Sequence, residues 1–378
     1  MQREGPLQII IGKYDVGDKA HGPIYVNFAM APSKMKAAVT IGEKGRVAVK
    51  EIDVPKPGPG ELLVKIVASA ANPTDWKTVT RIATSGNVVG CDYAGTIEEF
   101  GAEVPEAFRK VGTRVAGFIH GGAYPNGAQA EYGVASAATA ILIPDSWTLE
   151  EASQLPVAAF TACMTLYYVQ SLPTPLSPAT EEPRTDILVW GGSSSVGQFV
   201  VQLAHRGNLR VIATASPHNF DLVKSLGADV VLSHSDPDTP SKIRELTGRK
   251  LKHAVDTISE GSTPAQVAEC MGDEGGTVST TLRYESPRKD VEVKFVLGYM
   301  LLGKATEIPY KLPADPAQHE FAKKASDLLS KALAKDLLKP GPIRILPKGL
   351  ESVNEGFDLL RNGKVSGEKI VYRIPDTP

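Results

Sequence analysis

The sequence predicts an α/β protein in which a β-rich domain is followed by a doubly wound parallel sheet. Two patterns carry this prediction. Residues 35–144 contain short β-type runs broken by Gly and Pro, which is typical of a small twisted barrel. From Asp186 onward, short apolar runs alternate with helix-length segments, as in βαβ units. A chain of 378 residues is long enough for both domains.

In the β-rich part, turn signals such as the Pro-Gly-Pro-Gly run at 57–60 separate the strands. The strands that we expect there are 35–39, 46–54, 62–68, 91–100, 114–118 and 130–143. Residues 150–170 have helix-spaced apolar positions, and 171–184 form a connector rich in Pro, Ser and Thr.

In the second part, expected strands and helices alternate regularly. Its expected strands are 187–190, 210–213, 230–232, 253–258 and 277–280, and its expected helices are 196–205, 219–226, 241–246 and 264–271. The tail follows with a helix at 318–335, a strand at 343–346, a helix at 350–362 and a strand at 369–374. Because a strand–helix–strand piece is small to stand alone, we expect it to return to the β-rich domain.

Composition excludes several classes of function. The chain has 41 Lys and Arg against 43 Asp and Glu, so neither nucleic acid nor an anionic membrane finds a basic surface. The longest apolar stretches, such as 295–303, are well short of the roughly 18 residues that span a bilayer. Three distant Cys make neither a disulfide framework nor a structural zinc site, which favours a reducing, cytoplasmic location.

A glycine- and serine-rich turn, 191–197, joins the first strand of the second part to an apolar helix. Against the G-x-G-x-x-G fingerprint, Gly192 and Gly197 occupy the outer positions and Ser194 replaces the middle glycine. Such a turn directs the first amides of a helix toward a pyrophosphate, and the helix dipole adds attraction. We expect dinucleotide contacts at Ser194, Ser195, Val196 and Gly197; an ordinary Gly-Ser turn is the alternative.

The next strand ends without the acidic residue that binds the ribose hydroxyls in NAD sites, since no Asp or Glu lies between this strand, 210–213, and Asp221. A 2′-phosphate would therefore meet no repulsion, and hydroxyl, imidazole and amide donors stand at the start of the following helix. The segment expected at that phosphate is Ser216, Pro217, His218 and Asn219. We expect NADPH as the cofactor; the alternative is that Ser216 only caps the helix.

Further motifs extend over nearly the whole chain. They are Asn72-Pro-Thr-Asp-Trp-Lys77, Gly90-Cys-Asp-Tyr-Ala-Gly-Thr96, Val111-Gly-Thr-Arg-Val115, Leu155-Pro156, Thr161-Ala162, Ser216-Pro-His-Asn-Phe220 and Ser366-Gly-Glu-Lys369. Together with the 191–197 loop they resemble the medium-chain dehydrogenase/reductase superfamily. Within it, the chain resembles zinc-independent, quinone oxidoreductase-like members, including the fungal trans-acting enoyl reductases of polyketide synthases.

The resemblance implies a GroES-like β-rich domain plus a Rossmann doubly wound parallel sheet. The implied boundaries are an extension of unknown role at 1–34, a GroES-like substrate domain at 35–157 completed by 313–378, and a Rossmann NADP-binding domain at 158–312. Within the extension 7–11 is a candidate strand, and a misassigned start codon before Met35 is the alternative. Relatives are monomers or homodimers, so both states stay open.

Zinc members of the superfamily bind a catalytic metal through a Cys near the position of Asn72, a His in a Gly-His-Glu motif and a further ligand. Here the motif reads Gly90-Cys91-Asp92, and Asn72 offers no thiolate. Three protein ligands are therefore not available, and we expect no metal. Without a Lewis acid, reduction of an activated C=C bond is favoured over alcohol oxidation, because a conjugated carbonyl already provides the electron sink.

By resemblance, the reaction is the NADPH-dependent reduction of the C=C bond of a small-molecule or carrier-bound α,β-unsaturated thioester or ketone. Lys77 is the first catalytic candidate, near the cofactor or the substrate carbonyl, with a solvated lysine as the alternative. Asn72 is the second, with shaping of the loop as the alternative. No convincing general acid emerges: Asp75 and Asp92 are expected to serve turns or domain contacts, or to assist proton delivery, and solvent is another proton source.

The other residues that the resemblance places at the cofactor are Thr74, Asp75, Trp76, Thr161, His234, Thr281, Leu282, Ser366 and Gly367. An exposed loop histidine is the alternative for His234. The expected substrate contacts are Phe160, Thr161, Met164, Phe295 and Tyr299, with packing as the alternative for the apolar residues. A polyketide synthase is a candidate partner. A reductase of free enones or quinones and a cofactor-binding protein without turnover are the competing functions.

Overall fold

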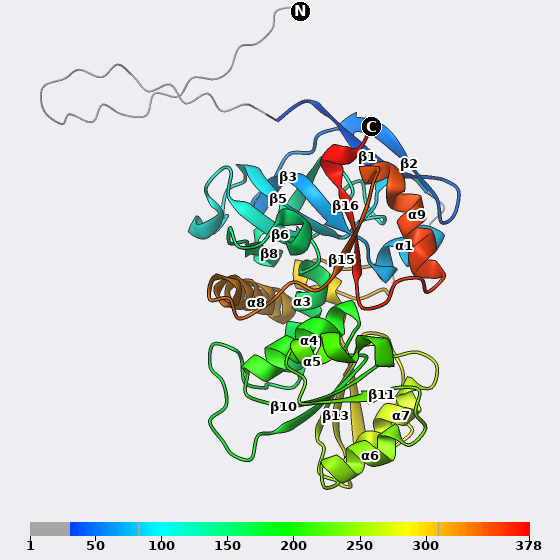
Figure 1. Cartoon of the computed structure of the whole chain (residues 1–378). Coiled ribbons are helices and arrows are strands. Elements are labelled where there is room, and N and C mark those ends of the chain that lie inside the picture. Colours follow the sequence, from blue (N-terminus) through cyan, green and yellow to red (C-terminus); the bar gives the residue numbers. More distant parts are fainter. Residues whose placement is uncertain (1–30, 82–83, 309) are drawn as a thin grey trace, which may run out of the picture.

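The computed structural model describes residues 31–81, 84–308 and 310–378. The strand expected at 7–11 lies outside these residues. Figure 1 shows two lobes, with the β-rich lobe at the top, the parallel sheet at the bottom, and helices α3 and α8 between them. Among the described residues, no helix has both the length and the apolar character that crossing a membrane requires.

Two sheets build the β-rich lobe. The smaller has the order β2-β1-β4 and consists of β1 (Lys34–Ile41), β2 (Val47–Asp53) and β4 (Ser85–Val88). The larger has the order β15-β16-β3-β5-β6-β8, with β7 also paired to β3. Its strands are β3 (Glu61–Ala70), β5 (Asp92–Phe100), β6 (Arg114–Phe118), β7 (Tyr132–Ser136), β8 (Ala140–Leu142), β15 (Ile343–Leu346) and β16 (Lys369–Arg373). Because β16 pairs antiparallel with β3, the tail returns to this lobe.

The parallel sheet has the order β11-β10-β9-β12-β13-β14, and all its neighbours run parallel. Its strands are β9 (Asp186–Trp190), β10 (Arg210–Ala215), β11 (Val230–Ser233), β12 (His253–Asp256), β13 (Gly276–Thr280) and β14 (Val291–Phe295). Its helices are α4 (Ser195–Arg206), α5 (Phe220–Ser225), α6 (Thr239–Leu246) and α7 (Thr263–Cys270). The order reverses between β9 and β12, so a ligand crevice is expected at the carboxyl ends of these strands.

Helices join the two lobes. The helix-spaced apolar positions at 150–170 form two helices: α2 (Leu149–Ala152) ends first, and α3 (Pro156–Cys163) then continues as a π-helical turn over Met164–Val169. The break lies where Pro156 starts a new helix, because proline suits a first turn but not a helix interior. Helix α8 (Pro316–Ala334) packs against both α3 and β8. Helix α9 (Val353–Arg361) packs on α1 (Pro73–Arg81).

Three elements are additions to the prediction: α1, β4 and β14. The start of α1 carries a local signal, because the Asn72 backbone N–H donates to the Asp75 carboxylate (2.7 Å) and Pro73 follows Asn72 directly. Strand β14 reads Val-Glu-Val-Lys-Phe and forms the edge of the parallel sheet. Its alternating charges suit an edge strand.

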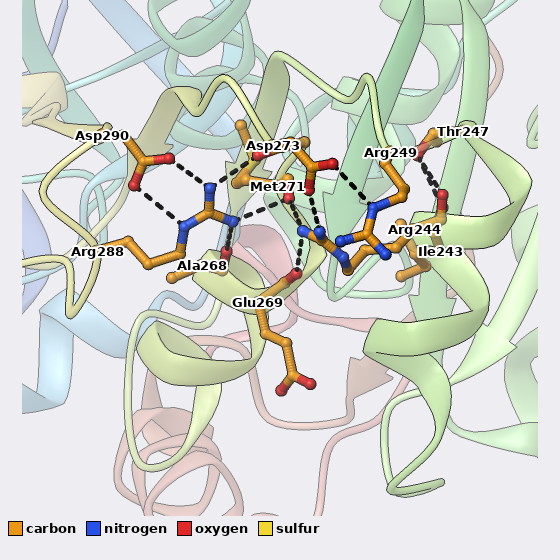
Figure 2. Close-up of polar contacts among 11 residues, drawn as sticks. Ile243, Arg244, Thr247, Arg249, Ala268, Glu269, Met271, Asp273, Arg288 and Asp290 are labelled. Carbon is orange, nitrogen blue, oxygen red and sulfur yellow. Dashed lines mark hydrogen bonds and ion pairs between the residues drawn. The ribbon is translucent and has the colours of Figure 1, made fainter.

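Far from the cleft, a cluster of arginines caps the C-terminal end of α7 (Figure 2). Arg244 donates to the carbonyls of Met271 and Glu269, and Arg288 donates to those of Ala268, Met271 and Gly272. Cations at a helix C-terminus satisfy the free carbonyls and complement the dipole. The cluster therefore ties α6, α7 and the segment before β14 into one rigid edge.

Candidate active site

The turn at 191–197 has the geometry of a pyrophosphate cradle. Gly191 has a φ of 84°, and a Cβ on Gly197 would lie 2.2 Å from the Gly191 carbonyl oxygen. Ser194 Oγ accepts the Gly197 N–H (2.9 Å) and donates to Thr257 Oγ1 (2.8 Å), which ties the turn to the end of β12. The close approach of Gly197 to Gly191 directs the first amides of α4, at Ser195 and Val196, toward the crevice. These amides have no hydrogen-bond partner within the helix.

The residues expected at a 2′-phosphate gather beside this turn. Ser216 Oγ and His234 Nε2, at the ends of β10 and β11, are 3.1 Å apart. Ser366 Oγ lies 3.0 Å from His218 Nε2 and 3.0 Å from Asn219 Nδ2. The Gly367 carbonyl accepts from Gln198 Nε2 (3.3 Å), so the tail segment lies against α4. No carboxylate takes part in these hydrogen bonds.

Lys77 crosses the cleft between the lobes. Its Nζ lies 3.0 Å from Glu260 Oε1, in the loop after β12, and one-third of its side chain is exposed. The N–H of Thr281, just before Leu282, donates to Ser259 Oγ in the same loop (3.2 Å). Trp76 differs from its neighbours because it packs against the core of the β-rich lobe. The structure thus brings Lys77 and Thr281 to the same loop after β12, and Leu282 follows Thr281 directly.

A buried polar network lies under the cleft. Asn72 Nδ2 donates to Asp92 Oδ2 (2.8 Å), and Lys369 Nζ donates to Asn72 Oδ1 (2.6 Å) and lies 3.4 Å from Asp92 Oδ2. Asp92 Oδ1 accepts the N–H of Val157 at the start of α3 (2.8 Å). Burial raises the pKa of Asp92, and the Lys369 ammonium opposes that rise. Asp92 therefore anchors α3, the helix that carries Thr161.

A second buried group connects α1 with the segment after β14. The Tyr299 hydroxyl lies 2.9 Å from Thr74 Oγ1 and 2.9 Å from Cys91 Sγ. The Tyr299 ring stacks on His120, with centroids 3.7 Å apart and an interplanar angle of 14°. Burial lowers the pKa of His120 to about 4, so this imidazole is neutral at physiological pH.

The Asp75 carboxylate makes stability depend on pH. Burial raises the pKa of Asp75 to about 7 from an ordinary value of 3.8. The unfolded chain therefore loses this proton near pH 4 and the folded chain near pH 7, so the free energy of unfolding falls as pH rises between them. We expect Asp75→Asn to remove this fall. The free energy of unfolding of the variant, relative to that of the wild type, should therefore rise by on the order of 4 kcal/mol from pH 4 to pH 8.

Urea unfolding at several pH values measures this difference. Asp145→Asn, at a fully exposed side chain, is the control and is expected to leave the wild-type pH profile unchanged. A difference between Asp75→Asn and wild type that stays constant with pH would contradict the raised pKa.

A pocket of about 820 Å³ lies between the β-rich lobe, the segment after β14 and helix α8. Its lining includes Phe118, His120, Tyr124, Tyr299 and Leu302, and its outer part reaches Lys323 on α8. Among the residues expected at the substrate, Tyr299 therefore lines the pocket.

The other expected substrate residues lie elsewhere. Phe160 and Met164 are almost fully buried in the core shared by the two lobes, which matches the packing alternative. The Phe295 ring packs edge-on against Tyr310. Thr161, at 6% exposure, lies close to Gly298 in the segment that carries Tyr299.

Sequence reasoning did not single out His120, the contacts of Lys369 with Asn72 and Asp92, or the contact of Cys91 with Tyr299. A lone His carries no local motif, and the partners of Lys369 and Cys91 are distant in the chain. Within 31–81, 84–308 and 310–378, no group of three or more His, Cys, Asp or Glu comes together as a metal site.

The comparisons with known proteins agree with this architecture. The alcohol dehydrogenase GroES-like domain matches residues 58–145, and the zinc-binding dehydrogenase family matches 195–328. The chain belongs to the medium-chain dehydrogenase/reductase family of oxidoreductases, and its fold is a GroES-like domain plus a Rossmann sheet.

Its relatives in sequence include fungal enzymes. The chain is 40% identical to trans-enoyl reductase ACTTS2 of Alternaria alternata, over 90% of this chain and 99% of that protein. It is 35% identical to trans-enoyl reductase RAP1 of Pyricularia oryzae, over 91% and 99%. Solved structures share the fold: an alcohol dehydrogenase superfamily protein of Novosphingobium aromaticivorans has a TM-score of 0.73 at 22% identity, covering 90% of this chain and 99% of that one. The CurK enoyl reductase has a TM-score of 0.71 at 18% identity, covering 90% and 99%.

Proposed function

We propose that the protein is an NADPH-dependent, zinc-independent enoyl reductase that reduces the C=C bond of an α,β-unsaturated thioester or ketone. The observation that carries this proposal is the junction of pocket and cleft. Tyr299 lines the pocket, and its hydroxyl contacts Thr74 on α1, the helix from which Lys77 crosses the cleft. A substrate in the pocket would therefore place its reacting end beside the dinucleotide crevice.

The residues at the crevice fit a phosphorylated dinucleotide. The turn at 191–197 and the start of α4 would bind the pyrophosphate, since a Cβ at Gly197 would fill the space that the turn needs. Ser216, His218 and Asn219 would hold the 2′-phosphate, and Thr161, Thr281 and Leu282 would contact the nicotinamide. When bound, the reduced nicotinamide supplies a hydride to the β-carbon. Lys77 would orient the substrate carbonyl and stabilise negative charge on its oxygen.

Zinc independence is supported by the charge beside Asp92. The Lys369 ammonium, 3.4 Å from Asp92 Oδ2 and 2.6 Å from Asn72 Oδ1, supplies the positive charge that a cation would bring there. A metal ion bound at the same oxygens would be repelled by it. The relatives named trans-enoyl reductases support a substrate carried by a polyketide synthase, on which this chain would act in trans.

The test is NADPH oxidation, followed by absorbance, with a crotonyl thioester, a longer enoyl thioester and a quinone. We expect the enoyl thioesters to be reduced faster than the quinone, with the saturated thioester as product and no effect of a zinc chelator. Faster reduction of the quinone would favour a quinone reductase. No oxidation of NADPH with any acceptor would overturn both enzymatic functions and leave a cofactor-binding protein.

Cofactor preference gives a separate prediction. Ser216→Asp introduces a carboxylate beside His234 at the end of β10, where it would repel a 2′-phosphate. We expect the KM for NADPH to rise roughly 100-fold and the KM for NADH to change less than threefold, as a charge repulsion of about 2.7 kcal/mol requires. Ser225→Asp adds the same charge at the exposed end of α5 and is expected to change neither. An unchanged preference in Ser216→Asp would place the phosphate elsewhere.

A further inference from the structure

The proposed reduction leaves an enolate that must gain a proton at the α-carbon, and no general acid is evident from the sequence. The structure places a phenolic hydroxyl on a residue of the pocket wall. Tyr299 is 5% exposed and lines the pocket, and its hydroxyl faces Thr74 at the cleft. Its stacked contact with His120, also in the pocket lining, fixes the ring.

Two further proton-bearing groups stand behind Tyr299. Cys91 is fully buried, and its Sγ lies 2.9 Å from the Tyr299 hydroxyl. Asp75 is buried and directly follows Thr74, whose Oγ1 contacts the same Tyr299 hydroxyl, and Asp75 and Cys91 each shift the pKa of the other. Asp75 Oδ2 accepts the Asn72 N–H, whereas Oδ1 has no hydrogen-bond partner in the described part of the chain. A phenol, a thiol and a carboxyl thus form a row from the pocket wall into the core.

We propose that the Tyr299 hydroxyl delivers the proton to the α-carbon, and that Cys91 and Asp75 resupply it. The inference rests on the proposed function. The Tyr299 O–H bond breaks as the α-carbon C–H bond forms, and the electron pair of the enolate makes the new bond. The Cys91 thiol proton moves to the phenolate oxygen, the Asp75 carboxyl proton moves to the thiolate, and water reprotonates Asp75 between turnovers. Apart from hydride addition to the β-carbon, no group is oxidised or reduced.

The environment supports this direction of transfer. Burial raises the pKa values of Tyr299 and Cys91, so neither the phenolate nor the thiolate persists. The pKa of Asp75, about 7, leaves a large fraction of this carboxyl protonated near neutral pH. Asp75 is therefore the acid of the row, and Tyr299 is the group that touches the substrate. Cys91 and Asp75 act through Tyr299.

The test uses the full chain, NADPH and an α-methyl enoyl thioester, whose product has a stereocentre at the α-carbon. A single fixed donor protonates one face, so the wild-type product is expected to be one enantiomer. Tyr299→Phe keeps the ring on His120 and removes the hydroxyl. We expect its kcat to fall roughly tenfold or more, with KM for the thioester within about twofold, and its product to become a mixture of enantiomers as water protonates both faces.

Matched variants separate the relay from packing. Tyr168→Phe removes a hydroxyl from an exposed ring packed on Phe321 and is expected to retain wild-type rate and stereochemistry. Cys91→Ser keeps a proton-bearing group and is expected to stay within about threefold of the wild-type kcat, whereas Cys91→Ala is expected to resemble Tyr299→Phe. Circular dichroism and NADPH affinity confirm that each variant is folded.

The outcomes distinguish the two proposals. A wild-type protein that reduces no enoyl thioester overturns the proposed function. A wild-type protein that reduces the thioester, together with a Tyr299→Phe variant of unchanged kcat and stereochemistry, overturns the proton relay alone. If Tyr299→Phe does not fold, the wild-type product remains informative, because a racemic α-carbon would rule out a fixed donor.

Discussion

Replacing Lys369 with Met is expected to lower the free energy of unfolding by about 3–5 kcal/mol at pH 8, because it leaves a buried carboxylate without its cation. Lys369 is 5% exposed and Asp92 is fully buried. The substitution also removes the donor to Asn72 Oδ1. Because Asp92 Oδ1 accepts the Val157 N–H, disturbance of Asp92 reaches the start of α3.

A double variant identifies the cause. Lys369→Met combined with Asp92→Asn removes both charges, and this pair is expected to recover part of the lost stability. Arg46→Met is the control: it breaks an ion pair with Asp358 in which both side chains are about two-fifths exposed, and it is expected to cost about 1 kcal/mol or less. Urea unfolding measures all three. A loss for Lys369→Met as small as that for Arg46→Met would show that Asp92 is not held by this charge.

Most of the fold follows from local patterns. Five strands of the parallel sheet, β9 to β13, are short runs between turn signals and could be placed to within a few residues. The central strands β9, β10 and β12 are buried on both faces, which makes their runs nearly continuous in apolar residues. The missed edge strand β14 alternates Val and Phe with Glu and Lys, and so resembles an exposed segment. Helix α1 was missed because only its first residues, Asn72, Pro73 and Asp75, carry a helix signal, and the short remainder has only Trp76 and Val79 as apolar positions.

The candidate site was likewise predictable where its residues are contiguous in the sequence, and not where they are distant. The turn at 191–197 is contiguous, so its glycines and serines reveal it without knowledge of the fold. The contacts between Asn72 and Lys369 and between Cys91 and Tyr299 join residues 297 and 208 positions apart, and no single-sequence pattern links them. Tyr299 was placed at the substrate by resemblance alone, whereas its neighbours Thr74, Cys91 and His120 are visible only once the two lobes pack together.

Gly197→Ala is expected to weaken NADPH binding roughly 100-fold, equivalent to about 2.7 kcal/mol. The added methyl would lie 2.2 Å from the Gly191 carbonyl oxygen, a backbone atom that cannot move without opening the turn. Opening the turn redirects the first amides of α4, and these amides are the expected ligands of the pyrophosphate. Fluorescence titration gives the Kd, and circular dichroism checks that the parallel sheet remains folded.

Gly192→Ala is the matched control, because it adds the same methyl five residues away in the same turn. There the nearest atoms are side-chain carbons of Ala213 and Val223 at 3.0 Å, which can yield by a few tenths of an ångström. We expect its Kd to rise less than about tenfold, or 1.4 kcal/mol. Since both variants lose one glycine, the difference between them isolates the close approach of Gly197 to Gly191. A Gly197→Ala variant with the NADPH affinity of the wild type would mean that the pyrophosphate does not bind at this turn.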